Sequence, residues 1–202
     1  FANDKLVQQF KTNTLKGFGI DGMNEAIIAA GAVLHYLEAT EHKDTQHISA
    51  IARIDEDKYV WLDKFTVRNL EIVSSQNEGG VPLLQVLDQT VTPMGSRNLR
   101  KWMILPLKDK QGIDERLQVV KQFYADEELT NKILEHLRQV SDLERLISKV
   151  AVGRINPREL LQLKRSLKSI LPVKEVLEKS ASAELKKLGD QLHRCDFLVE
   201  KI

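Results

Sequence analysis

Apolar residues recur every three or four positions through most of the stretch 113–171, which is the spacing of amphipathic helices. The best helix start lies inside it, where the Asn-Pro-Arg-Glu run at 156–159 combines an N-cap amide, a first-position proline and an N3 carboxylate. Pro172 should kink or end the helix that follows, because proline lacks an N–H and its ring clashes with the preceding turn. The pattern predicts a stack of antiparallel helices. The leucines expected to point inward from this helix are Leu160, Leu163, Leu167 and Leu171.

The remainder of the chain also favours helices, with one exception. Two short runs at 51–54 and 58–62 have β character, and the acidic triplet at 55–57 between them is typical of a solvated hairpin turn rather than a metal site. The predicted fold class is therefore mainly α, a multi-helical core with a small β-hairpin. Further helices are expected over 22–39, after Asp63, over 83–89, from Thr92 to Pro106, over 113–124 and 129–140, from a capping box at Ser141 and Glu144, and over 183–201.

The residue patterns that catalysis requires are missing from the sequence. Neither glycine cluster, at 17–19 or at 79–80, continues into a phosphate loop, and no zinc-ligand spacing occurs. His42 and His47 share a loop but are interpreted as polar loop residues, and Cys195 as a bystander thiol. We therefore expect no catalytic, cofactor-binding or metal-binding residue. As the only cysteine, Cys195 excludes an internal disulfide and favours a cytoplasmic protein, and the longest apolar run is too short to cross a membrane.

Two basic helix faces are the candidate binding residues. Arg97, Arg100 and Lys101 lie three and four positions apart on the helix that begins at Thr92, and Trp102 follows them. A second basic face, at 154–165, lies around the best-capped helix start and includes Arg154 and Arg158. Each face also has a purely structural interpretation, as a solvated surface or as a partner in ion pairs with neighbouring helices. The net charge of only +1 gives no general electrostatic argument for nucleic acid, so any DNA contact of this segment alone should be weak.

Four segments in a fixed order carry a family resemblance. The first is Phe-Gly-Ile-Asp at 18–21, before the small-residue helix at 26–37. The second is Leu-Asp at 62–63, followed by Thr-Val-Arg-Asn-Leu-Glu at 66–71. The third runs over 87–100 and ends with Pro-Leu at 106–107. The fourth is Asp-Leu-Glu-Arg-Leu at 142–146, leading to Gly-Arg at 153–154 and Pro-Arg-Glu-Leu at 157–160. Together these segments resemble the bacterial MutS mismatch-repair proteins.

The resemblance implies a position within a larger protein. Residues 1–20 would be the end of a connector and its linker, and residues 21–202 would be the first part of a helical core with antiparallel lever-type helices. The mismatch-reading, clamp and ATPase domains would lie outside this segment. Because the chain begins with Phe1 rather than Met, we expect an excised piece.

The resemblance also implies a function. The whole protein would be a homodimeric, DNA-dependent ATPase that uses ATP and Mg²⁺, binds mispaired DNA and recruits downstream mismatch-repair proteins. This segment would not be an enzyme and would couple the clamp and mismatch reader to the ATPase. The helix that begins at Thr92 is the candidate joint. The residues that would carry the coupling, or contact DNA weakly, are Arg97, Arg100, Lys101, Arg154 and Arg158.

Two other functions remain open from the sequence alone. The chain could be a stand-alone helical scaffold that binds a protein partner. It could also be the core of a superfamily relative that acts on recombination intermediates. The residues encoded on either side of this segment would distinguish these possibilities.

Overall fold

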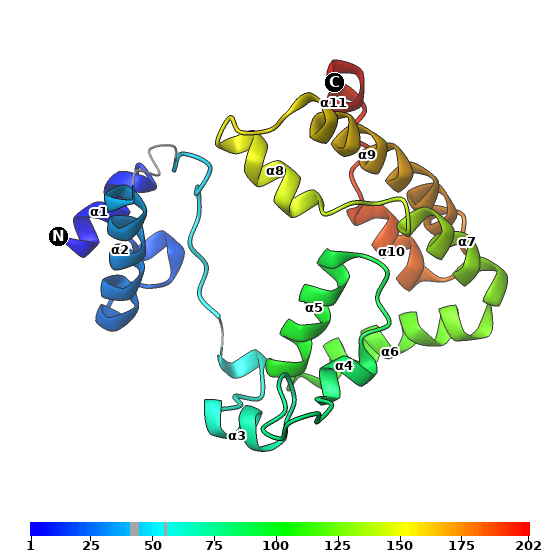
Figure 1. Cartoon of the computed structure of the whole chain (residues 1–202), viewed down its shortest axis with the longest axis horizontal. Coiled ribbons are helices and arrows are strands. Elements are labelled where there is room, and N and C mark those ends of the chain that lie inside the picture. Colours follow the sequence, from blue (N-terminus) through cyan, green and yellow to red (C-terminus); the bar gives the residue numbers. More distant parts are fainter. Residues whose placement is uncertain (41–44, 55) are drawn as a thin grey trace. The chain divides into compact units, whose positions relative to one another are not determined.

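The computed structural model describes residues 1–40, 45–54 and 56–202, and these fold into two compact units. Unit 1 comprises Phe1–Asp55 with Ile147–Ile155, and unit 2 comprises Glu56–Leu146 with Asn156–Ile202. The described residues are mainly helical, as predicted (Figure 1). The α-helices are α1 (Ala2–Gln9), α2 (Asn24–Ala39), α3 (Lys64–Asn69), α4 (Leu83–Leu87), α5 (Pro93–Ile104), α6 (Lys110–Ala125), α7 (Glu127–Leu137), α8 (Leu143–Ala151), α9 (Pro157–Glu178), α10 (Ala183–Gln191) and α11 (Asp196–Lys201). Two short 3-10 helices are η1 (Lys16–Phe18) and η2 (Glu56–Lys58).

Unit 1 is built on the packing of α1 against α2, which lie side by side in Figure 1. The two helices approach closely at Gly31, where an added Cβ would lie 2.6 Å from the Cβ of Ala2. The close approach requires a residue without a side chain at position 31. The buried core residues of the unit are Leu6, Leu15, Ile20 and Leu34.

Unit 2 is centred on α9, which packs against α7 and α10 (Figure 1). Gly189 of α10 lies against α9, and an added Cβ there would lie 3.1 Å from the Cβ of Leu177. Asp126 forms the corner between α6 and α7, because it is the C-cap of the first helix and the N-cap of the second. The buried residues of this core are Ile133, Val173, Leu177 and Leu185, and a second cluster contains Leu146, Leu163 and Leu167.

The predicted β-hairpin is wrong, because the described residues contain no β-strand. The run at 58–62 finds its partner elsewhere. Tyr59 forms an isolated antiparallel bridge with Leu107, and the Val60 N–H donates to the carbonyl of Pro106 at 2.8 Å. Residues 51–54 are not in any helix or strand, and Asp55 of the predicted turn lies outside the described residues. The second run therefore pairs with a segment distant in sequence, around Leu107, and not with the neighbouring run at 51–54.

Two predicted helix ends in the C-terminal half differ from the structure, and of the two outcomes predicted at Pro172, a kink or an end, the end is wrong. Pro172 does not end α9, which continues to Glu178 and buries Val173 and Leu177 in the first core cluster of unit 2. The predicted helix over 183–201 is instead α10 and α11, separated around Cys195, whose φ of 54° is left-handed. The break lets Leu192 pack on one core cluster and Cys195 on the other. In both cases core packing outweighs local helix preference.

The start of α8 differs from its prediction by one residue. Asp142, rather than Ser141, caps the helix by accepting a hydrogen bond from the Arg145 backbone N–H at 3.2 Å. The Ser141 hydroxyl accepts from the side chain of Gln162 instead, at 2.8 Å.

The apolar stripe of α6 is divided between two surfaces. Val119 and Phe123 pack against the core of unit 2. Leu117 and Val120 of the same helix are 57% and 61% exposed, so they lie outside this core. None of the helices in the described part of the chain has the length and hydrophobicity that crossing a membrane requires.

The predicted cap of α9 is confirmed and provides a first testable expectation. The Asn156 side chain accepts from the Glu159 N–H at 2.9 Å, and the Glu159 carboxylate accepts from the Asn156 N–H at 3.2 Å. Replacing Asn156 with Ala should lower the free energy of unfolding by about 1 kcal/mol, because one helix-terminal N–H loses its acceptor. Urea denaturation checks this. Asn156→Asp should stay close to wild type, since the carboxylate can cap, and an equal loss in both variants would contradict the reason given.

Candidate functional site

Helix α5 is fixed at its start by three hydroxyl side chains. The Thr92 hydroxyl accepts from the Gly95 N–H at 3.1 Å, and Pro93 occupies the first position, as the sequence predicted. One turn earlier, the Asp88 carboxylate accepts from the hydroxyl of Ser96 and, at 2.6 Å, from that of Thr90. These bonds hold the pKa of Asp88 below its usual value, with Ser96 the largest contributor. The turn before α5 is thus tied to the helix, and Arg97 follows directly.

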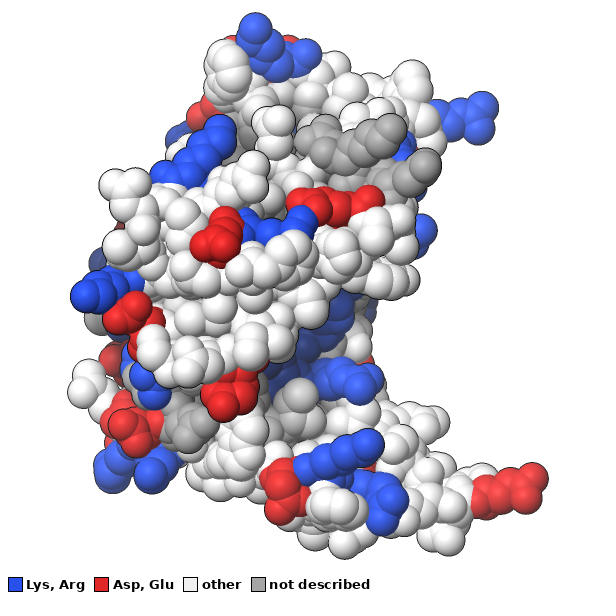
Figure 2. Space-filling view, turned by 90° about the vertical axis from the view of Figure 1, so that its left-hand side faces the viewer, with Lys and Arg blue, Asp and Glu red and all other residues white. Residues whose placement is uncertain are grey.

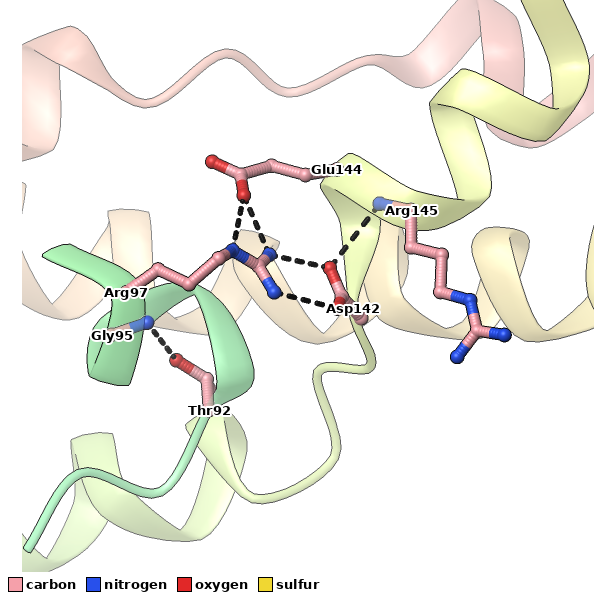
Figure 3. Close-up of polar contacts among 6 residues, drawn as sticks. All are labelled: Thr92, Gly95, Arg97, Asp142, Glu144 and Arg145. Carbon is pink, nitrogen blue, oxygen red and sulfur yellow. Dashed lines mark hydrogen bonds and ion pairs between the residues drawn. The ribbon is translucent and has the colours of Figure 1, made fainter.

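The guanidinium of Arg97 binds the carboxylates of Asp142 and Glu144 at the start of α8 (Figure 3). We call these three residues the Arg97 clamp. Its Nη1 and Nη2 donate to the two oxygens of Asp142 at 2.9 Å and 2.7 Å. Its Nε and Nη2 donate to Oε2 of Glu144 at 2.8 Å and 2.5 Å. Bidentate pairing of this kind specifies geometry as well as charge, because the planar guanidinium fits a carboxylate edge. The clamp therefore fixes α5 relative to the first turn of α8.

The Arg97 clamp lies at a partly solvated surface. The side chain of Asp142 is 22% exposed, whereas those of Arg97 and Glu144 are 47% and 67% exposed. Hydrogen bonds from Arg97 are the main cause that holds the pKa of Asp142 below its usual value, and the pKa of Arg97 is raised in turn by both carboxylates. The Asp142 pair is the more sheltered of the two, so we expect it to contribute more than the Glu144 pair.

The titration of Asp142 should show directly that the pKa of its carboxyl group depends on Arg97. Because its pKa is lowered in the folded state, the carboxylate stabilises the fold fully at pH values above the pKa of the unfolded chain, which is about 3.9. This stabilisation is lost as the pH falls through the lower pKa of the folded state. In Arg97→Gln the midpoint should rise towards the usual value. Carboxyl NMR of the two proteins measures the shift, with Asp63, whose pKa is lowered by the Thr66 N–H, as an internal reference that should not move. An unchanged Asp142 midpoint in the variant would show that Arg97 does not hold this carboxylate.

The other members of the first basic face take no part in this contact. Arg100 and Lys101 are exposed, and neither pairs with another described residue. Trp102 is 42% exposed and stacks under the guanidinium of Arg116 of α6, with 3.8 Å between the guanidinium carbon and the ring centroid. The structure thus separates the predicted face into one internal contact, Arg97, and two outward cations.

The two arginines of the second basic face fall in different units. Arg154 belongs to unit 1 and Arg158 to unit 2, and both are exposed. On the face drawn in Figure 2, basic and acidic side chains lie close together in small groups, with uncharged surface between them.

Asp88, Asp142 and Glu144 are site residues that sequence reasoning missed as such. Arg97 and Asp142 are 45 positions apart, and local spacing says nothing about a contact at that distance. One signal was available, because Arg97 and Asp142 lie in two of the four ordered segments that carried the family resemblance. The contact shows that these two segments meet in space.

The two glycine clusters noted in the sequence form a tight turn and a short 3-10 helix. The backbone at Gly80 lies against Ser75, where an added Cβ would be 2.0 Å from the hydroxyl oxygen, so this glycine turn is closed on itself. Gly17 lies within η1, and Gly19 is the C-cap of that short helix. No group of three or more His, Cys, Asp or Glu side chains in the described ranges could hold a metal ion, and His42 lies outside those ranges. The expectation that this segment carries no cofactor stays a prediction.

Family models account for most of the chain. Residues 1–49 match the model described as MutS domain II, and residues 65–202 match the one described as MutS domain III. The chain belongs to the MutS family. Unit 2, with the Arg97 clamp, lies mostly in the part that matches domain III of MutS.

Relatives from several bacteria carry the name DNA mismatch repair protein MutS. The relative from Christiangramia forsetii is 52% identical over 202 residues, which is 100% of this chain and 23% of the relative. The one from Cytophaga hutchinsonii is 50% identical over the same length and is covered to 24%. The one from Bacteroides fragilis is 48% identical over 201 residues and is covered to 23%. The chain thus spans about a quarter of the length of these MutS proteins.

Proposed function

We propose that this segment is the mechanical link of a MutS mismatch-repair protein, connecting the parts that bind mispaired DNA to an ATPase. The observation that carries the proposal is the Arg97 clamp, read together with the family match. Packed helices joined by a few oriented contacts change arrangement in discrete steps, so they can pass on a movement that a uniform, loosely packed bundle would absorb. In this proposal the antiparallel helices around α9 act as the levers.

The residues that reach outward from α5 are Arg100 and Lys101. Because both are exposed on the helix that Arg97 anchors, they are suited to contact a neighbouring domain, which we propose to be the ATPase. Arg97 itself holds α5 in place. Arg154 and Arg158 are proposed as weaker contacts to DNA or to other domains, since their exposure leaves them accessible.

The activities of the whole protein are part of the same proposal. It would bind mispaired DNA, hydrolyse ATP with Mg²⁺, act as a homodimer in the cytoplasm and recruit downstream repair proteins. This segment would hydrolyse nothing itself. A stand-alone scaffold is not favoured, because two MutS domains match consecutive parts of the chain. The boundary that the sequence predicts between connector and core, after residue 20, stays a prediction that limited proteolysis can test.

The coupling role predicts that one change on α5 will reduce the activity of the full-length protein without lowering the stability of this segment. In the full-length protein, Arg100→Gln with Lys101→Gln should reduce the stimulation of ATP hydrolysis by mismatched DNA several-fold, because coupling free energies between sites are about 1–3 kcal/mol. In the 202-residue chain the same change should alter the unfolding free energy by less than about 0.5 kcal/mol, since both side chains are exposed. A steady-state ATPase assay with mismatched and perfectly paired duplexes measures the first effect. Lys121→Gln with Lys132→Gln, at exposed positions of α6 and α7, is the matched control. Stimulation that survives intact in the α5 variant would refute the proposed joint.

A further inference from the structure

We propose that the Asp142 carboxylate links the position of α5 to the order of the first turn of α8. The inference rests on the proposed coupling role and names the atom through which α5 would act on its neighbour. Asp142 has two functions in the structure: it is the acceptor of the Arg97 clamp and it is the N-cap of α8 (Figure 3). One of its oxygens serves both.

The shared oxygen is Oδ1. It accepts from Nη2 of Arg97 at 2.7 Å and from the backbone N–H of Arg145 at 3.2 Å. Oδ2 accepts from Nη1 of Arg97 at 2.9 Å, so the guanidinium fixes both the plane and the rotation of the carboxylate. The Arg97 clamp thereby directs Oδ1 towards the helix terminus. If Arg97 withdraws, the side chain of Asp142 regains rotational freedom and the cap loses its orientation.

Comparison with the other aspartate caps shows why this one depends on Arg97. Asp63, Asp109 and Asp126 cap their helices with N–H···O distances of 2.8, 2.7 and 2.9 Å. In the described residues, none of these three shares its capping oxygen with an arginine side chain. The cap of Asp142 is longer than all three, so it is the one whose strength depends most on how the carboxylate is held.

The consequence is a conformational device. Linkage is reciprocal, so a displacement of α5 that breaks the Arg97 clamp loosens the start of α8, and a loosened α8 weakens the hold on α5. A contact made by Arg100 or Lys101 on the same helix would then be transmitted to α8 through Arg97 and Asp142.

Amide hydrogen exchange of the whole 202-residue chain, followed by NMR, tests the device. In Arg97→Gln the Arg145 amide should exchange at least about threefold faster than in wild type, as expected for coupled neighbours. The Thr66 and Leu129 amides, capped by Asp63 and Asp126, should keep their rates. An Arg145 rate that is unchanged or slower in this variant would overturn the proposal, since the cap would then be independent of Arg97 or in competition with it.

Two further variants make the test independent of global folding. Arg100→Gln removes an equal charge from the same helix and should leave the Arg145 rate unchanged. Arg97→Lys keeps the charge but lacks the planar fork, so it should give an intermediate rate. If Arg97→Gln accelerates all four aspartate-capped amides equally, the effect is general destabilisation and the device is refuted. If Arg97→Gln accelerates the Arg145 amide selectively but the stimulation of ATP hydrolysis by mismatched DNA survives in the full-length protein, only the proposed function is refuted.

Discussion

Replacing Leu185 with Ala should lower the unfolding free energy of unit 2 by about 2–5 kcal/mol. The side chain is 1% exposed and lies in α10, where it packs in a cluster with Ile133, Val173 and Leu177. Truncation removes apolar burial and leaves a cavity among side chains that are held by three different helices and cannot all relax inward. Such a loss is a large fraction of the 5–15 kcal/mol that typical domains possess.

Urea unfolding followed by tryptophan fluorescence measures this loss, because Trp61 and Trp102, the two tryptophans of the chain, both belong to unit 2. The matched control is Leu117→Ala in α6, where the same atoms are removed from a side chain that is 57% exposed. It should cost less than about 0.5 kcal/mol. Similar losses in the two variants would mean that α6 and α10 do not present the faces described above.

Replacing Gly31 with Ala should destabilise unit 1 by about 2 kcal/mol, although alanine is the better helix former. The new Cβ would lie 2.6 Å from the Cβ and 2.8 Å from the Cα of Ala2, so α1 and α2 would have to separate. Such a separation would loosen the packing of Leu6 against Leu34 in the core of this unit. Faster amide exchange over residues 1–40, measured by mass spectrometry, reports the loss.

The control for this change is Gly17→Ala. An added Cβ at Gly17 meets no atom within 4 Å, and the residue lies in η1 with no left-handed backbone conformation. Its exchange pattern should match that of wild type. Gly31→Ala would contradict the structure if it protected residues 1–40 as well as wild type does, since the helix pair would then have room for a side chain.

The features that could be predicted from sequence depend on neighbours in the chain. Thr92, Asp63 and Asn156 each cap a helix whose capped N–H lies three positions later, so the pairing is written into local spacing. The burial of Leu163 and Leu167 followed for the same reason, because helical periodicity places them on one face. The family resemblance was confirmed because it rested on four ordered segments rather than on one.

The features that could not be predicted depend on contacts distant in sequence. The run at 58–62 has β character, but nothing local indicates that Tyr59 pairs with Leu107 instead of a neighbouring run. For α6, periodicity revealed apolar residues without showing which of them the core would cover: Val119 packs against the core, whereas Val120 is exposed. The candidate site was half predicted: Arg97 stood out by its position, whereas Asp142 was recognisable only once the fold brought it there.

The corner at Asp126 has a consequence for how this region can change in evolution. One residue ends α6 and begins α7, so no linker separates the two helices. Inserting a single residue into the first turn of α7 would rotate the rest of that helix by about 100° and turn Ile133 away from α9. Substitutions that keep a capping side chain at 126 are therefore tolerable, whereas insertions and deletions are not. Length variation among family members should be concentrated elsewhere, such as the exposed turn that contains Gly79.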